Sequence, residues 1–523
     1  MPSAVTIETA ENGTHALRRI TVLLWVSATL LYTLTASGWI QTIDVIQSIA
    51  VATQIVDHGG RLWVDNLWSV GFPQSIVGPG WGPVAGVGHH FYVAHSFGEA
   101  FVMLPTAVLR HIGLISDGVM QFLDSLVNPL AGGALVAATF RVMHRLSGRL
   151  RASVVGAILI GFASMVWPYA HFSFDATPTA LFLMLALLGI LGLAENPSRR
   201  RSLGVGAALA GALFFRIDSA PIVFIDLIWL LWTLRPIPLG DRVKNLACVA
   251  GPLVLVVLTT ALYNIARFGS IFDDGHRLDT SVRHTFPLLR GVADLLISPG
   301  RGILVFTPLL LVAALGVPWL FRRAPGLVVS QAVSILIVLL FDATLTNFPG
   351  LIAWGPRFLV PVLPIALLPL IGVLVRWRDV RLITRVISMV LIAASAVIQI
   401  VAVCLPTAYL DYFNDSLDHP RRIEAWHGGG QLWQALHQAF VNIRDVTTLM
   451  PHVFLINPTI PDFWWISQQS VVATHSVVNY SVAAVLAIAL GITVRMLWVE
   501  LRDQTVAIEA SPTPKEVLAP PSA

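Results

Sequence analysis

The sequence predicts an all-α polytopic membrane protein with about twelve transmembrane helices and a large first outer loop. Composition is the first reason, because 56% of the 523 residues are hydrophobic and 12% are charged. Soluble domains carry roughly 25% charged residues, so this chain cannot cover a water-exposed globule. The second reason is that apolar stretches long enough to cross a bilayer, about 20 residues each, recur along the chain. The sequence lacks the alternating pattern of outer-membrane barrel strands.

Short basic clusters orient these helices, because loops rich in lysine and arginine stay on the cytoplasmic side. The clusters lie at 18–19, 141–151, 199–201, 235–244, 322–323, 376–385 and 502. Spans consistent with them are expected at 20–40, 119–143, 152–170, 174–194, 203–217, 219–234, 243–266, 303–321, 327–345, 357–376, 382–405 and 476–499. We therefore expect a multi-pass cell membrane protein with both termini inside. The basic residues serve this orientation, and no nucleic acid partner is expected.

The same placement divides the chain into five parts. They are a cytoplasmic segment at 1–18, a transmembrane core at 19–405 that includes the outer loop 41–96, an extracytoplasmic segment at 406–475, a last transmembrane helix at 476–499 and a disordered cytoplasmic tail at 500–523. The outer loop opens with an amphipathic stretch ended by Gly59 and Gly60, which predicts a helix on the membrane surface. The segment 97–114 is apolar but short, so a dipping or interfacial helix is expected there. Cys248 and Cys404 lie in apolar segments, where helix packing is the expected role.

Ionisable residues collect at the expected outer ends of helices and in the outer loops. They are Asp44, Asp175, Asp218, Asp273, Asp274, Arg216, Arg267, Arg301 and Arg357. Charges near a membrane are costly, so their convergence on one side indicates a site. Guanidinium forks bind phosphate bidentately and a carboxylate accepts a proton, so the set suits a lipid-linked phosphate substrate.

Several of these residues also have purely structural interpretations. Asp44 opens the expected surface helix and Asp175 precedes another helix, so either side chain could be an N-cap. Arg357 opens an apolar helix and could simply extend to the interface. Arg301 is flanked by glycines in SPGRG, which free the backbone for close approach to an anion and favour phosphate binding.

Three histidines, His89, His90 and His95, lie in one outer stretch. Neighbouring histidines in a loop are more often solvated or hydrogen-bonded than metal-bound, so no metal site and no cofactor are expected. The remaining polar residues near the expected site are kept as candidate substrate-binding residues. They are His95, Arg267, Asp273 and Asp274.

Four segments carry recognisable motifs. They are Asp44 with A-x-x-I-V-x-x-G at 52–59, GHHFYVAHSFGEAFVMLP at 88–105, the pair RFGSIFDDGH and LLISPGRGILVFTPLLL, and WGPRFLVPVLP at 354–364. Together they resemble the GT-C superfamily of multi-spanning glycosyltransferases, especially bacterial relatives of the dolichyl-phosphate-mannose protein mannosyltransferases. The pair of segments is the most specific. One departure is Val45, because many relatives carry a glutamate directly after the aspartate.

The resemblance implies transfer of one sugar from a polyprenyl-phosphate-linked donor to a glycan, lipid or protein acceptor outside the cytoplasm. It implies an inverting, metal-independent reaction in the core at 19–405. Asp44 is then the candidate catalytic base, while Arg357 and Arg301 are candidate ligands of the donor phosphate. Asp175 is the second catalytic candidate. A second carboxylate could also come from Asp273 or Asp274, or not be needed; the sugar, mannose or arabinofuranose among others, stays open.

A transporter or flippase of lipid-linked sugars is the alternative function. It would also need arginines near phosphate, but it would place charges along a path through the middles of the helices. The expected middles carry few charges, with Asp226 and Asp342 among the exceptions, which favours the enzyme. We therefore expect Asp44, Arg301 and Arg357 to surround one cavity open to the membrane.

Overall fold

The computed structural model describes residues 4–40, 42–64, 83–275, 284–345, 353–405, 432, 461–466 and 476–510. Within these ranges the chain is helical apart from loops and one small hairpin, in which β1 (Val84–Ala85) pairs antiparallel with β2 (Phe91–Tyr92). The 3-10 helix η3 (Val87–His89) closes this hairpin. The predicted all-α class is confirmed for the described part of the chain.

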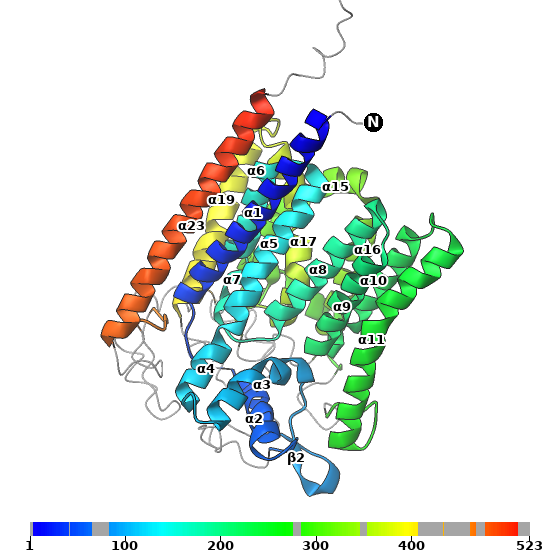
Figure 1. The fold of residues 1–523 in the computed structure, drawn as a ribbon, viewed down its shortest axis with the longest axis vertical. Helices are drawn as coiled ribbons and strands as arrows, with labels where there is room; N and C mark the ends of the chain where they lie inside the picture. The colour runs from blue at the N-terminus through cyan, green and yellow to red at the C-terminus, as the bar shows by residue number, and fades with distance from the viewer. Residues whose placement is uncertain are drawn as a thin grey trace, which may run out of the picture.

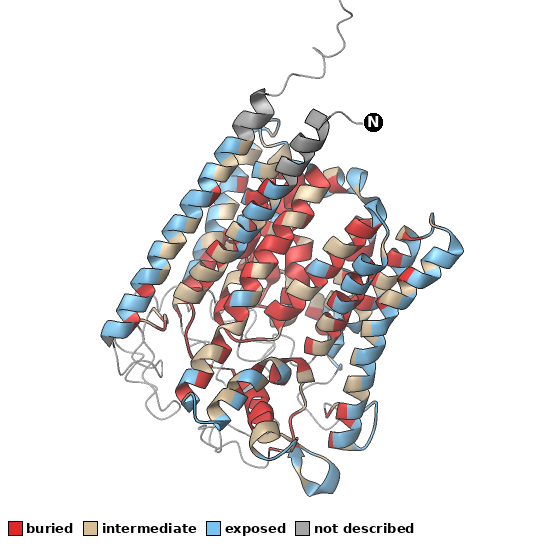
Figure 2. Ribbon diagram, viewed as in Figure 1, coloured by how far each residue is buried: buried red, intermediate tan, exposed pale blue. Residues whose placement is uncertain are grey.

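A bundle of long helices forms the body of the molecule (Figure 1). Its members are α1 (Ala4–Leu34), α5 (Val127–Ser147), α8 (Ala176–Glu195), α9 (Arg199–Phe215), α11 (Leu239–Phe268), α16 (Pro325–Ala343), α19 (Leu382–Cys404) and α23 (Ser476–Ala510). The helix α1 packs against α5 and α23, α8 packs against α5 and α9, and α9 packs against α11. Figure 2 shows buried residues gathered in the middle of the bundle, while α11 and α23 are largely exposed.

Shorter helices complete the bundle. They are α6 (Leu150–Phe162), α7 (Val166–His171), η4 (Ile217–Ser219), α10 (Ala220–Thr233), α12 (Leu288–Ile297), α13 (Ile303–Phe306), α14 (Leu309–Ala314), α15 (Val317–Arg323), η6 (Arg357–Val362), α17 (Leu363–Ala366) and α18 (Leu370–Val375). Prolines explain several of the breaks, because a proline donates no backbone hydrogen bond and clashes with the preceding turn. Pro308 precedes α14, Pro364 lies in the first turn of α17 and Pro369 precedes α18.

Among the described residues, eight helical stretches are long and apolar enough to cross a membrane. They are His15–Leu34, Asp117–Ser147, Ala176–Glu195, Leu239–Phe268, Pro325–Ala343, Arg357–Val375, Leu382–Cys404 and Val477–Gln504. Large apolar side chains on their outward sides, such as Leu255, Leu262, Val485 and Ile488, are exposed. Such faces need an apolar solvent, which supports a multi-pass membrane protein. The expected spans 152–170, 203–217, 219–234 and 303–321 fall on shorter helices, so the number of about twelve stays a prediction.

Three helices gather at one end of the bundle, opposite the N-terminus of α1 and the C-terminal end of α23 (Figure 1). They are α2 (Ile43–Asp57), α3 (Phe97–His111) and α4 (Asp117–Ser125). The helix α2 packs against α3, which also contacts α4 and α9. The expected helix within 97–114 is thus present as α3, and its position at a membrane interface stays a prediction.

The apolar side of α2 is covered by protein. Ile46, Ile49, Ala50 and Thr53 are all buried, and the first two belong to a cluster that includes Met103 of α3. The expectation of a helix lying on the membrane surface is therefore wrong. An amphipathic pattern fits an apolar protein surface as well as lipid, and here α3 provides that surface.

Helices run past two of the expected segment boundaries. The helix α1 already begins at Ala4, inside the expected N-terminal segment, and α23 continues to Ala510, past the expected boundary at 499. The expected segment 406–475 lies outside the described residues except for 432 and 461–466. The division into five parts stays a prediction. Cys248 and Cys404 are both free thiols.

Candidate functional site

The carboxylate of Asp44 lies between an arginine and a histidine side chain at the start of α2. Its Oδ2 is 2.7 Å from Nη2 of Arg357, and its Oδ1 is 3.5 Å from Nε2 of His95. The side chain of Asp44 is 23% exposed, so it remains accessible. Burial by itself would raise the pKa of Asp44, but the charges of Arg357 and His95 outweigh it and the pKa is lowered. Asp44 is therefore ionised at neutral pH.

Asp44 is not the N-cap of α2. That position belongs to Thr42, and its side chain makes no capping hydrogen bond. The Thr42 hydroxyl instead donates to the carbonyl of Ser173, 2.8 Å away, in the loop before α8. This bond ties the start of α2 to the segment that carries Asp175, so both carboxylates are held at the same end of the bundle.

Asp175 occupies the N-cap position of α8, but its side chain makes no capping bond. Its Oδ1 accepts a hydrogen bond of 3.1 Å from Nη1 of Arg216, which follows α9. The same guanidinium donates from Nε to Asp218, 3.0 Å away, and pairs with it again through Nη2. Asp175 and Arg216 thus form a second acid and arginine pair beside the first.

Aromatic rings hold the two arginines in place. The guanidinium carbon of Arg357 lies 5.2 Å from the ring centre of Phe358, and that of Arg216 lies 5.4 Å from the same ring. Arg357 also lies over Phe174 at 4.8 Å. The buried Nε of Arg357 has no hydrogen-bond partner within the described ranges. Arg357 is therefore largely enclosed by protein and directed at Asp44, which does not favour the interpretation that it simply extends to the membrane interface.

The turn at 353–356 positions Arg357. Nη1 of Arg301 donates to the first carbonyl of this turn, and the hydroxyl of Tyr169 donates to the next at 3.0 Å. Gly355 has φ of 60°, a left-handed conformation that glycine adopts without strain. Arg301 is 7% exposed and acts electrostatically on Tyr169, as Arg357 does. Arg301 thus lies near the site but holds the turn, and the structure gives no contact between it and Asp44.

Glu99 is a site residue that the sequence reasoning missed. It lies in the first turn of α3, is 8% exposed, and its Oε2 accepts a hydrogen bond of 3.1 Å from the Ser48 hydroxyl of α2. Burial raises the pKa of Glu99 well above its usual value, and the neighbouring charges of Asp175 and Asp44 add to this. A signal was available, because Glu99 is the single carboxylate in the segment 88–105 and it opens an apolar helix.

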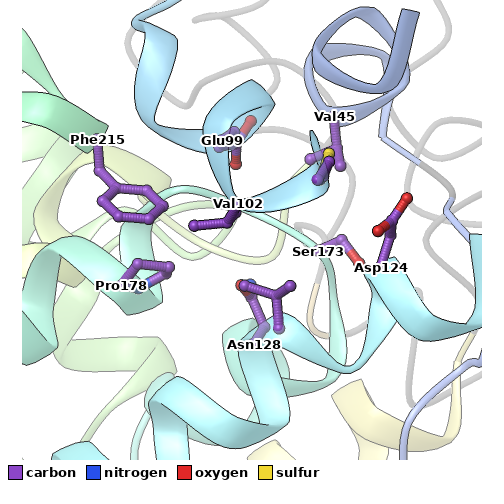
Figure 3. Close-up of a pocket in the computed structure, with 10 residues that line it drawn as sticks. Val45, Glu99, Val102, Asp124, Asn128, Ser173, Pro178 and Phe215 are labelled. Carbon is purple, nitrogen blue, oxygen red and sulfur yellow. The ribbon is translucent and has the colours of Figure 1, made fainter. Parts of the chain in front are cut away.

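A small cavity adjoins Glu99 (Figure 3). Its polar lining consists of Glu99, Asp124, Asn128 and Ser173, and the space is on the order of one water molecule. The Nδ2 of Asn128 donates to three carbonyls of the segment 169–174, at 2.7–3.0 Å, and so fixes the chain that leads into Asp175. This cavity is too small for a sugar, and it is not the membrane-open cavity that the sequence predicted.

The other expected substrate-binding residues separate into two groups. His95 lies at Asp44, whereas Arg267 lies beneath the chain at 93–95 and donates to its carbonyls. Asp273 accepts a hydrogen bond of 3.0 Å from the Gly275 N–H within its own turn. Asp273 and Asp274 act electrostatically on Arg267. Arg267, Asp273 and Asp274 therefore lie on the side of the 93–95 chain away from Asp44. The structure gives none of them a contact with Asp44.

The expectation of no metal site stays a prediction for the described part of the chain. No group of three or more histidine, cysteine or acidic side chains lies close enough there to hold an ion. The ring of His90 stacks on Trp63 with centres 4.3 Å apart, so one histidine of the 89–95 stretch has a packing role.

Comparisons with known proteins find similarity at the level of structure. No family model matches the chain, and no curated protein matches its sequence. ArnT from Cupriavidus metallidurans bound to undecaprenyl phosphate is similar, with a TM-score of 0.46 and 14% identity over 93% of this chain and 78% of that chain. The archaeal oligosaccharyltransferase AglB from Archaeoglobus fulgidus, in complex with an inhibitory peptide and a dolichol-phosphate, gives a TM-score of 0.41 and 14% identity.

The AglB comparison covers 86% of this chain but 60% of AglB, so this chain spans less than two thirds of that protein. At these identities and TM-scores the likeness concerns the arrangement of the helices and assigns no residue a role.

Proposed function

We propose that this protein is a polyprenyl-phosphate-dependent glycosyltransferase of GT-C type, with its active site at the end of the bundle formed by α2, α3 and α4. The observation that carries this proposal is the Asp44 carboxylate, accessible and ionised between Arg357 and His95. The four motif segments support the same reading, because the first contributes Asp44, the second His95 and the last Arg357. A proton acceptor and an anion-binding group then lie within contact distance of each other.

Asp44 would act as the general base. Its carboxylate accepts the proton of the acceptor hydroxyl while the acceptor oxygen forms a bond to the anomeric carbon of the donor sugar. The bond between that carbon and the phosphate oxygen breaks, and its electron pair leaves on the polyprenyl phosphate. The lowered pKa of Asp44 keeps its carboxylate ionised at neutral pH, as a general base requires. A single displacement of this kind inverts the anomeric centre and needs no metal ion.

Arg357 would bind the donor phosphate. Its position over Phe174 and Phe358, with Nη2 paired to the accessible carboxylate of Asp44, holds a planar guanidinium beside the proposed base. Arg301, the other expected phosphate ligand, would contribute mainly by holding the turn before Arg357. Asp175 would act through Arg216, whose charge it shares with Asp218.

The donor would be a polyprenyl-phosphate sugar whose lipid chain lies in the bilayer, and the acceptor would be a glycan, lipid or protein outside the cytoplasm. The protein would therefore act in the cell membrane with its α2–α4 end on the extracytoplasmic side. The buried Asp226 bears on the transporter alternative. It accepts a hydrogen bond of 2.8 Å from Gln331, which joins α10 to α16 and gives that intramembrane charge a packing role.

The test is transfer from a defined donor by the purified protein in liposomes. Labelled polyprenyl-phosphate mannose and polyprenyl-phosphate arabinofuranose are supplied in turn with a cell-envelope extract, and released polyprenyl phosphate and labelled product are measured. We expect release with one donor and loss of release in Asp44→Asn. If the protein moves donor between leaflets without breaking the sugar–phosphate bond, the transporter is the correct function. If neither activity appears with a wider set of hexose and pentose donors, the proposal is wrong.

A further inference from the structure

Arg267 is a buried arginine whose hydrogen bonds go to backbone and amide oxygens. It lies in the last turn of α11 and is 2% exposed. Its guanidinium donates to the carbonyls of Val93 and His95, and to Oδ1 of Asn264 at 2.8 Å. The ring of Tyr263 lies 3.7 Å from its guanidinium carbon. A buried guanidinium is stable only when its N–H groups are hydrogen-bonded. These hydrogen bonds therefore hold the end of α11 against the chain at 93–95.

The hairpin beside this chain also rests on the end of α11. Gly86 lies so close to the carbonyl of Arg267 that a Cβ at that position would be 2.2 Å from the oxygen. The Gly86 N–H donates to the His90 carbonyl at 2.8 Å, and the Val64 N–H donates to the carbonyl of Phe91 at the same distance. The segment that ends in His95 is therefore held at several points, and Arg267 holds the last of them.

We infer that Arg267 is a positioning residue, which fixes the backbone of His95 so that its imidazole stays against the carboxylate of Asp44. The contacts form one path: the Arg267 guanidinium donates to the His95 carbonyl at 3.3 Å, and the His95 Nε2 lies 3.5 Å from Asp44 Oδ1. Arg267 would then act by positioning His95, whereas the sequence had suggested that it binds substrate directly. The inference about turnover rests on the proposed function, whereas the placement of His95 can be measured without it.

The position of His95 should also affect how the transfer rate falls at acid pH, because transfer needs the ionised form of Asp44. The charged groups that act on Asp44 come from five segments: Arg357 of η6, His95 before α3, Arg216 after α9, Asp175 before α8 and Glu99 of α3. If His95 moves away, one charge that lowers the pKa of Asp44 is lost. That pKa then rises, and the acid limb moves to higher pH.

The first measurement needs no donor. In Arg267→Lys the charge stays but a lysine cannot contact several fixed acceptors in one plane. The rate at which diethyl pyrocarbonate modifies His95, followed by peptide mass spectrometry across pH, reports how the imidazole is held. We expect a several-fold change in Arg267→Lys and no change in Arg110→Lys, a control that removes the guanidinium fork of a partly buried arginine between α2 and α3. An unchanged His95 rate in Arg267→Lys, with the variant folded by size-exclusion chromatography, overturns the inference.

The second measurement uses transfer. Arg267→Lys should lower kcat by about 10–100-fold with little change in the donor KM, because small misplacements of reacting groups have effects of that size. The double variant with His95→Gln should be no slower than His95→Gln alone, since both changes remove the same arrangement. Independent, multiplying effects would contradict the positioning role. If the wild type transfers no sugar but His95 modification still changes in Arg267→Lys, the proposed function fails while the positioning role stands.

Discussion

Arg357 and Asp44 form an ion pair of 2.7 Å between η6, late in the chain, and α2, near its beginning. The pair joins the group proposed to bind the donor phosphate to the group proposed to take the acceptor proton. A phosphate that approaches Arg357 therefore also approaches Asp44, which places the breaking bond near the base. The same guanidinium lowers the pKa of Asp44, so a change at Arg357 affects both donor binding and the proton transfer.

Asp44→Asn removes the base and keeps the shape of the side chain. The N-cap of α2 is Thr42, so the cap is kept, but the loss of the ion pair with Arg357 should lower the unfolding temperature to some extent. General-base catalysis contributes about 10²–10⁴-fold, and transfer should fall by roughly that factor. Polyprenyl phosphate release by the two purified proteins, at equal donor concentration, measures it. A wild-type rate in Asp44→Asn would show that Asp44 is not the base, and Asp175 and Glu99 would be the next carboxylates to test.

Arg357→Lys keeps the positive charge but loses the planar fork. A hydrogen bond to a charged group contributes about 1.5–3 kcal/mol, so donor binding should weaken by roughly 10–100-fold. Competition by free polyprenyl phosphate, measured as an inhibition constant, reports this binding directly. Arg110→Lys, which alters an arginine paired with Asp57 and Asp117, should bind the lipid phosphate normally. Equal inhibition of wild type and Arg357→Lys would show that phosphate binds elsewhere.

Asn128→Asp replaces the amide that donates to three carbonyls of the segment 169–174. The new oxygen cannot donate, so the carbonyls of Phe172 and Phe174 lose this donor, whereas that of Tyr169 keeps the Thr177 hydroxyl, and the free energy of unfolding should fall by about 1–3 kcal/mol. Thermal unfolding in detergent measures the loss. Because this segment leads into Asp175, transfer should also decrease. A variant as stable as the wild type would mean that these carbonyls have other partners.

The sequence predicted the helical membrane architecture, because this follows from the composition. It also predicted that Asp44 and Arg357 lie close together, because both residues were expected at the outer ends of their helices. It did not predict that the apolar face of α2 is buried in protein. Lipid and a neighbouring helix offer the same apolar surface, so an amphipathic pattern cannot separate them. Only the packing of α2 on α3 decides between the two.

The roles of the other arginines could not be predicted for a related reason. Arg216, Arg267 and Arg301 all lie near the same end of the bundle, but which acceptor each one meets depends on the rotation of its helix. Arg216 meets carboxylates, whereas Arg267 and Arg301 meet backbone carbonyls. Spacing along the chain carries no such information. Glu99 was missed likewise, because its partners Ser48 and Asp175 come from other helices.

Glu99→Gln tests the protonation of the buried carboxyl beside Asp44. The pKa of Glu99 is raised in the folded protein, so its contribution to stability is fully present below the pKa of the unfolded chain and is lost as pH rises toward the folded value. Glutamine resembles the protonated form and does not ionise. The unfolding temperatures of the wild type and of Glu99→Gln are measured from acidic to alkaline pH. That of the wild type should fall more steeply as the pH rises.

The Ser48 hydroxyl can donate to the amide oxygen of Gln as it does to Oε2 of Glu99, so at acidic pH the two proteins should have similar stability. Parallel curves across the whole range would mean that Glu99 is ionised in the folded protein, stabilised by Arg357 and Ser48 against the charge of Asp44.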